Sequence, residues 1–223
     1  MRNIYKIFLI VKLIVFKDFV EEIKSKEIFI SIISYSILVL VVVATTSSAK
    51  NSVEFFATVF WISISFSIIL GINKSMNKEF ENKGIEYLIT SPIDKEIIIF
   101  AKFCTNFIFI NIASILIIVF NNVILNYDLY DPYFILLIFI INFGFSIIGT
   151  ITFLLFSKVR GKEILSPLLF IPLVTPLLMG GAVLTVQIIN KDIQNFSWYG
   201  LIIAYDLLFL AIGFLISNII FQE

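Results

Sequence analysis

One acidic residue lies inside an apolar stretch of this sequence, where a carboxyl group could do chemistry. Asp206 follows Trp198 by eight residues in an otherwise apolar run, a separation of ~12 Å along a helix. A carboxyl group at that depth in a membrane is a candidate functional group, because burying its charged form is costly. It could relay protons or form a hydrogen bond between subunits. The alternatives are a structural polar contact and a neutral, protonated acid.

A second unusual stretch combines three prolines with two glycines. Pro167, Pro172 and Pro176 precede Gly180 and Gly181. Each proline removes a backbone donor, so a helix through this stretch is expected to kink or break. Such helices line pathways or act as hinges, and the alternative is a kink that serves only packing. Pro172 and Pro176 therefore join the buried acid as intramembrane candidates.

Several kinds of site are excluded by residues that the sequence lacks. Histidine is absent and Cys104 is the single cysteine, which excludes a histidine-dependent catalytic triad, an internal disulfide and a multi-cysteine metal site. The sequence has no phosphate-binding G-x-x-x-x-G-K-[ST] loop and no C-x-x-C-H haem attachment motif. We therefore predict no catalytic, cofactor-binding or metal-binding residues. The 16 basic and 16 acidic residues cancel, so nucleic acid is not an expected partner.

The segment from Asn73 to Glu96 mixes charged and apolar residues. It is too short to fold alone, and a short helix with an apolar edge would gain from a protein partner. The alternative is an ordinary solvated loop. Within it, Ser91-Pro92-Ile93-Asp94 is typical of a helix start, with Ser91 as N-cap, Pro92 at the first helical position and Asp94 at the third.

The elements that must position these residues are membrane-spanning helices. The 223 residues are 60% hydrophobic and 14% charged, with a mean hydropathy of +1.05, which is far from the composition of a soluble domain. Roughly 20 apolar residues are needed to span a bilayer as a helix, and six stretches qualify. They are Ile28 to Ala44, Val53 to Ile72, Ile97 to Phe120, Tyr133 to Phe156, Ile164 to Val186 and Trp198 to Phe221. The sequence thus predicts an all-α integral membrane protein with six transmembrane helices.

The basic residues predict the orientation of these spans. Thirteen of the 16 lie in the segment before span one, the loop after span two and the loop after span four, while only Lys50 and Lys191 lie on the other side. Positively charged loops stay on the cytoplasmic side, so both ends of the chain are expected inside. The remaining cation, Lys102, lies within span three and is expected to extend back to the cytoplasmic surface.

Residues 1–27 are predicted to form an amphipathic interfacial helix that precedes the 28–223 transmembrane domain. At 100° per residue, five of their charged side chains fall on one arc: Arg2, Lys6, Lys17, Glu21 and Lys24. Such a helix would lie in the membrane interface, with its lysines at the lipid headgroups. Lys12 falls off this arc. The alternatives are a disordered basic leader and a cleaved signal peptide ending near Ala49.

Residues along almost the whole chain also resemble a known family. They are Lys17-Asp18, Ser25-Lys26-Glu27, Leu70 to Ser75, Glu79, Glu81, Gly84, Leu88 to Asp94, Lys102, Arg160, Glu163 to Leu165, Trp198, Gly200 and Ala204 to Leu210. In this order they resemble the CcmB family, the permease subunits of the haem exporter-like ABC transporter of cytochrome c maturation.

The resemblance implies an ABC-2-type permease with an elbow helix, six spans and a cytoplasmic coupling helix seated on a separate ATPase, CcmA. ATP would be bound by that partner, and haem is the implied substrate. The implied assembly has two permeases and two ATPases, with CcmC, CcmD and the haem chaperone CcmE as further partners. Carried onto this chain, the coupling element is Asn77 to Ile89. The implied coupling residues are Glu79, Glu81, Gly84, Leu88, Ser91, Pro92 and Asp94.

Other functions remain open at this point. The chain could be an ABC-2-type permease for a lipid-linked glycan or a drug, or a membrane scaffold without transport. Within the CcmB reading, the transporter would either export haem or use ATP to release haem-loaded chaperone. The implied location is the bacterial inner membrane, with the mitochondrial inner membrane as the alternative. None of these readings makes the chain itself an enzyme.

Overall fold

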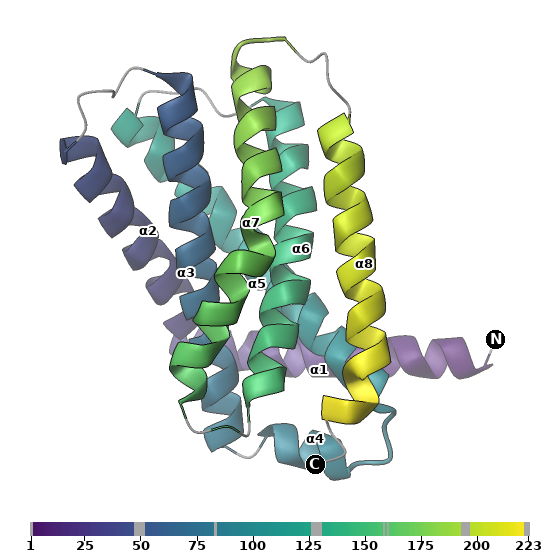
Figure 1. Ribbon diagram of the computed structural model, residues 1–223. Helices are drawn as coiled ribbons and strands as arrows, with labels where there is room; N and C mark the ends of the chain where they lie inside the picture. Colours follow the sequence, from purple (N-terminus) through teal and green to yellow (C-terminus); the bar gives the residue numbers. More distant parts are fainter. Residues whose placement is uncertain are drawn as a thin grey trace.

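The protein is an all-helical bundle in every part of the chain that can be described. The computed structural model describes residues 2–46, 52–82, 84–125, 131–157, 159, 161–192 and 197–220. Eight helices lie in these ranges: α1 (Arg2–Ser25), α2 (Glu27–Thr46), α3 (Val53–Glu81), α4 (Gly84–Thr90), α5 (Lys95–Leu125), α6 (Pro132–Phe156), α7 (Lys162–Ile189) and α8 (Ser197–Ile220). Helices α2, α3 and α5 to α8 run along the bundle, while α1 crosses it near the end where α4 lies (Figure 1).

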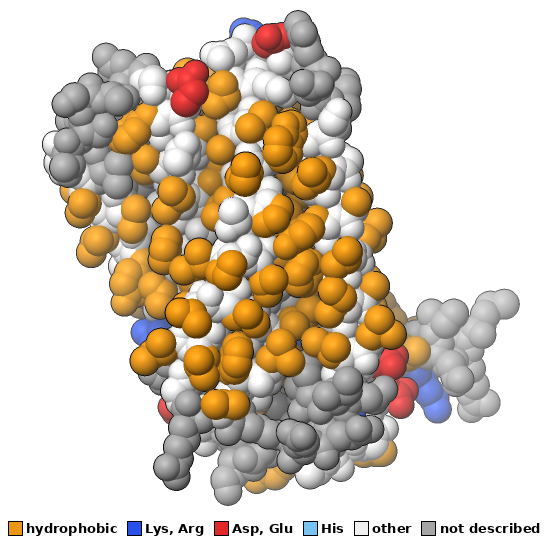
Figure 2. Space-filling model, viewed as in Figure 1, with side chains coloured by type: hydrophobic (Ala, Val, Ile, Leu, Met, Phe, Trp, Pro, Cys, Tyr) orange, Lys and Arg blue, Asp and Glu red, His pale blue; other side chains and the backbone are white. Residues whose placement is uncertain are grey.

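Five of the helices in the described residues are long and apolar enough to cross a membrane: α3, α5, α6, α7 and α8. They match the predicted spans two to six. The predicted first span falls in α2, whose described apolar segment, Phe29–Val39, is shorter. The sixth crossing and the orientation therefore stay predictions. Hydrophobic side chains cover the flank of the bundle, and the charged side chains in view lie toward its two ends (Figure 2).

The bundle is layered around α3 and α6. In both helices 72% of the most apolar window is buried inside the protein, against 22% in α8. Because α8 has one side on the bundle and the other exposed, its outer leucines are available to lipid. Figure 1 shows α8 and α2 on opposite flanks, and α8 ends near the end of the bundle that holds α1 and α4. The candidate residues of α8 thus face the bundle from its periphery.

The prolines of α7 do not interrupt its helical assignment. The helix runs from Lys162 to Ile189 through all three prolines, and it bends along its length (Figure 1). The predicted kink is therefore confirmed, whereas a break is not observed. The following glycines serve close packing: a Cβ on Gly181 would lie 2.8 Å from the Trp61 ring. That ring is fully buried and donates from Nε1 to the Thr185 hydroxyl (2.9 Å).

A single residue in the left-handed conformation joins α1 to α2. Lys26 has φ 56°, its N–H donates to the Glu22 carbonyl (2.6 Å), and its own carbonyl accepts from the Ile30 N–H (3.0 Å). Left-handed backbone is unfavourable for residues with a Cβ, and glycine is the residue that normally adopts it. The two helices therefore meet at a sharp corner without an intervening loop.

This corner predicts a stabilising substitution. Lys26→Gly should raise the free energy of unfolding by ~0.5–1 kcal/mol, because the relief of strain exceeds the entropy that glycine adds to the unfolded chain. Thermal unfolding in detergent measures the effect. Lys24→Gly is the matched control, since Lys24 is exposed and helical. Lys24→Gly should lower the free energy of unfolding by up to ~1 kcal/mol. An increase in both variants would contradict the prediction.

Candidate functional site

The segment predicted as the cytoplasmic coupling loop is mostly helical. The second span was predicted to end at Ile72, but α3 continues without interruption to Glu81. The short helix α4 then covers Gly84–Thr90, and Ser91 to Asp94 lead into α5. The predicted coupling element therefore consists of the last turn of α3 followed by α4. Figure 1 shows α4 at the end of the bundle.

The predicted helix start at Ser91 is wrong. Its hydroxyl donates to the Leu88 carbonyl of α4 (2.5 Å), so Ser91 closes the preceding helix. The start of α5 belongs to Asp94, whose carbonyl accepts from the N–H groups of Ile97 (3.0 Å) and Ile98 (3.3 Å). The reason is that the end of α4 leaves carbonyls unpaired, and the serine hydroxyl donates to one of them.

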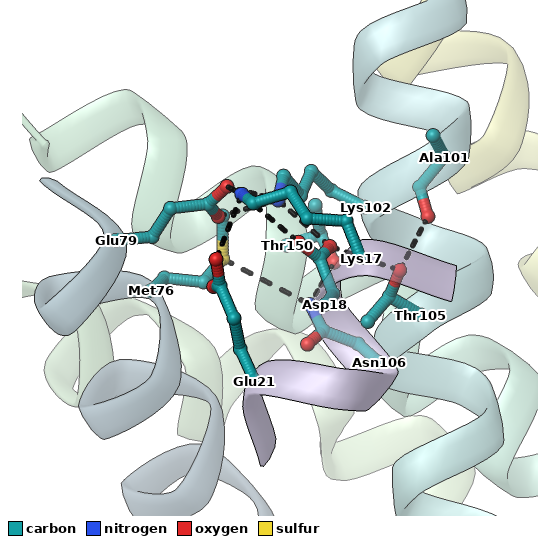
Figure 3. A network of polar contacts seen from close by, with 10 residues as sticks. All are labelled: Lys17, Asp18, Glu21, Met76, Glu79, Ala101, Lys102, Thr105, Asn106 and Thr150. Carbon is teal, nitrogen blue, oxygen red and sulfur yellow. Dashed lines mark hydrogen bonds and ion pairs between the residues drawn. The ribbon is translucent and has the colours of Figure 1, made fainter. Parts of the chain in front are cut away.

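Glu79 is the centre of an ionic junction between three helices (Figure 3). Its carboxylate, on α3, is 10% exposed and accepts a hydrogen bond from the Lys17 ammonium of α1 (2.9 Å). The Lys102 ammonium of α5 donates to both of its oxygens, at 2.5 Å to Oε1. Charge-assisted bonds of this kind are among the strongest polar contacts in a protein. Glu79 thus ties α3 to both α1 and α5.

Lys102 does not extend to the surface, which corrects the sequence prediction. The residue is 3% exposed, and its ammonium also donates to Asp18 Oδ2 of α1 (2.8 Å). The same Asp18 oxygen accepts from the Thr105 hydroxyl (3.2 Å). A lysine extends to water when no buried partner is near, and here two carboxylates meet it inside the protein. We define Lys17, Asp18, Glu79 and Lys102 as the ionic junction.

The helix α1 has three faces instead of the predicted two. Asp18 and the buried Ile14 face the bundle, while Tyr5, Phe8 and Phe16 are exposed on another side and form an apolar surface suited to lipid. Lys12 is also exposed. The predicted polar arc forms the third face, and the Lys17 ammonium reaches from it to Glu79. Its half-burial lowers the Lys17 pKa, but the carboxylates of Glu79, Asp18 and Glu21 raise it more, so the net shift is upward.

The predicted coupling residues fall into an inner and an outer group. In the inner group, Gly84 lies against Glu79, because a Cβ there would be 2.8 Å from Glu79 Cγ. Leu88 is partly buried and packs on the hydrophobic core. In the outer group, Glu81, Pro92 and Asp94 are exposed, beside Tyr87, which is 71% exposed. One side of the segment therefore contacts the ionic junction, and the other is open.

Sequence reasoning did not identify Lys17, Asp18 and Thr105 as site residues. The available signal was a cation in the apolar run of span three and acids on the bundle-facing side of the first helix. Asp18 and Lys102 are 84 residues apart in sequence. Their pairing depends on how α1 crosses the bundle, which no local pattern specifies.

Asp206, the first intramembrane candidate, lies where α8 packs on α6 and α7. Asp206, on α8, is 3% exposed and faces α6 and α7: a Cβ on Gly144 would lie 2.1 Å from its Oδ1 and 2.6 Å from Leu177 Cδ1. The neighbouring Tyr205 hydroxyl donates to the Leu173 carbonyl of α7 (2.7 Å).

Two of the α7 prolines differ in their surroundings. Pro176 is partly buried and lies next to Leu177. The Leu177 side chain reaches Gly144, the same glycine that Asp206 contacts. Pro172 is on the exposed side of α7. The structure therefore brings Asp206 and the Pro176 region together and leaves Pro172 outside this contact. In the described residues, no group of three or more His, Cys, Asp or Glu side chains could hold a metal ion.

Comparison with known proteins identifies the family. The family model described as CcmB protein matches residues 9–218, which is nearly the whole chain. Neither the curated proteins nor the solved structures contain a match. The match covers most of α1, the predicted coupling segment, the ionic junction and Asp206. The chain therefore belongs to the CcmB family, and it is a multi-pass membrane permease of cytochrome c maturation.

Proposed function

We propose that this chain couples ATP hydrolysis by a separate CcmA-type ATPase to haem export or to the release of haem-loaded chaperone. The observation that carries the proposal is the two-sided coupling segment. Its outer side, with Tyr87, Glu81 and Pro92, is exposed at the end of the bundle. Its inner side contacts Glu79 through Gly84. A partner that pushes on α4 would therefore act directly on the ionic junction.

The route of this motion follows from the contacts. A displacement of α4 presses Gly84 on the Glu79 side chain, and Glu79 is bonded to Lys17 of α1 and Lys102 of α5. Because these bonds are charge-assisted and largely buried, the three helices should move together. The Ser91 to Asp94 corner gives α5 a second connection to α4. In this mechanism Glu79 acts from inside the bundle, whereas Glu81 and Asp94 are available to the ATPase.

The proposed assembly pairs two copies of this chain with two ATPase subunits. Its further partners are CcmC, CcmD and the haem chaperone CcmE. It lies in the bacterial inner membrane, with α1, α4 and both chain ends on the cytoplasmic side. The sequence contains no histidine, the commonest axial ligand of haem. This supports a role in which ATP drives release of the loaded chaperone more than one in which this chain ligates haem iron.

The outer side of α4 can be tested by replacing an exposed aromatic. Tyr87→Ala should weaken co-purification with the ATPase by roughly 10–100-fold, since exposed aromatics are frequent anchors of interfaces. It should also lower the yield of haem-attached c-type cytochromes without changing the thermal stability of the permease. The measurement is quantitative pull-down from membranes that express both subunits.

The matched control is Tyr133→Ala. Tyr133 is also exposed, at 56%, but it lies at the start of α6, at the end of the bundle away from α4. The Tyr133→Ala variant should leave the ATPase bound. Equal losses in both variants would refute the coupling surface. Normal c-type cytochromes in a strain that lacks this chain would refute the proposed function as a whole.

A further inference from the structure

The carboxyl group of Asp206 lies in an environment that does not support a charge. Oδ1 is buried and has no hydrogen-bond partner, and no ion pair to Asp206 exists in the described part of the chain. The facing elements offer no compensation: α6 presents Gly144 and α7 presents Leu177. The adjacent titratable group on α8 is Tyr205, whose hydroxyl donates a hydrogen bond to the Leu173 carbonyl. A carboxylate without a partner in an apolar interior is strongly disfavoured relative to the neutral acid.

The packing restricts which ligand this group can take. A single Cβ atom on Gly144 would come within 2.1 Å of Oδ1, so the space between α6 and α8 at this level is already filled. A metal ion or a water molecule therefore does not fit between Gly144 and Oδ1. A proton adds no volume and removes the charge. The geometry therefore favours a proton as the ligand over any cation or substrate group.

We propose that Asp206 is an intramembrane proton-binding site whose occupancy controls the packing of α8 on α6 and α7. With the proton bound, α8 lies against Gly144. Loss of the proton leaves a carboxylate that must reach water or a cation, and α8 has to separate from α6 for this to happen. Only one side of α8 packs on the bundle, and α8 is the least buried of the five candidate spans in the described residues.

The contact on α7 lies beside a weak point of that helix. Pro176 has no N–H, so the Pro172 carbonyl lacks its usual helical donor. The Tyr205 hydroxyl bonds the next carbonyl along the chain, that of Leu173. Movement of α8 would remove this bond next to the carbonyl that Pro176 leaves without a helical donor. Protonation of Asp206 is thereby connected to the bend of α7.

Infrared spectroscopy of the full chain in lipid bilayers tests the protonation directly. We expect the carbonyl band of a protonated carboxylic acid at neutral pH, absent from Asp206→Asn and unchanged in Glu79→Gln. The Glu79 variant is the matched control because that carboxylate is also largely buried but has ammonium partners. Absence of the band at neutral pH in the native sequence, or its persistence in Asp206→Asn, would overturn the proposal.

A disulfide cross-link tests the movement of α8. A Cβ on Gly213 of α8 would lie 3.1 Å from the end of the Ile151 side chain of α6, so Gly213→Cys with Ile151→Cys forms a reporter pair in a Cys104→Ser background. Relative to the same pair with Asp206→Asn, the yield should fall several-fold from neutral to alkaline pH. An equal pH profile in the two proteins would refute the coupling between the proton and the packing. Neither experiment depends on the ATPase or on haem.

Discussion

Replacing Lys102 with alanine should lower the free energy of unfolding by about 3–5 kcal/mol, the typical cost of removing one partner from a buried ion pair. Lys102 is 3% exposed and serves both Glu79 and Asp18. Without it, two carboxylates remain inside the protein, and both still contact the Lys17 ammonium. Detergent-induced unfolding of the purified chain measures the loss, and coupled ATP turnover should fall with it.

Two further variants separate loss of charge balance from loss of packing. Lys102→Met with Asp18→Asn removes one charge of each sign and leaves the Lys17 and Glu79 pair, so at least half of the stability should return. Lys74→Ala is the control for an exposed lysine on α3, and it should stay within about 0.5 kcal/mol of the native chain. If Lys102→Ala behaves like Lys74→Ala, the ionic junction has no energetic role.

The second large effect is expected inside the membrane domain. Gly144→Ala should lower the free energy of unfolding by about 3 kcal/mol, because overpacking a filled interior displaces its neighbours. The added Cβ would lie 2.1 Å from Asp206 Oδ1 and 2.6 Å from Leu177 Cδ1, distances that no real Cβ contact shows. The variant should therefore push α8 outward, and thermal unfolding in detergent should record a lower midpoint.

Gly200→Ala is the matched control on α8, since nothing lies within 4 Å of a Cβ at that position. Alanine is the better helix former by up to ~1 kcal/mol, so this variant should be neutral or stabilising. Adding Asp206→Ala to Gly144→Ala removes the carboxylate from the clash and should restore part of the loss. A destabilised Gly200→Ala, or no rescue by the second substitution, would count against this contact.

The long apolar helices could be predicted closely from the sequence. The predicted fourth span, Tyr133 to Phe156, differs from α6 by one residue, because Asp131 and Pro132 mark its start and the apolar run fixes its length. The extension of α3 past Ile72 was missed because its last nine residues are polar enough to resemble a loop. Their helicity comes from continuity with the span and from Glu79, which pairs inside the bundle.

The position of the candidate site along the chain was predictable, but its division into two sides was not. Glu79 and Glu81 are both acids near the end of one helix, and nothing local distinguishes them. Their difference arises because α1 and α5 bring ammonium groups to one side of α3 only. Ser91 shows the same limit, since a motif typical of a helix start instead closes the helix before it.

The uninterrupted course of α3 has a mechanical consequence. The helix of 29 residues is a rod ~43 Å long at 1.5 Å per residue. Near Ile72, whose side chain fills the space beside Gly149, the rod is in close contact with α6. If it pivots there, the arm toward Glu81 measures ~13 Å and the arm toward Val53 ~28 Å. A displacement of α4 by one ångström would then swing the far end of the lever by about twice that distance.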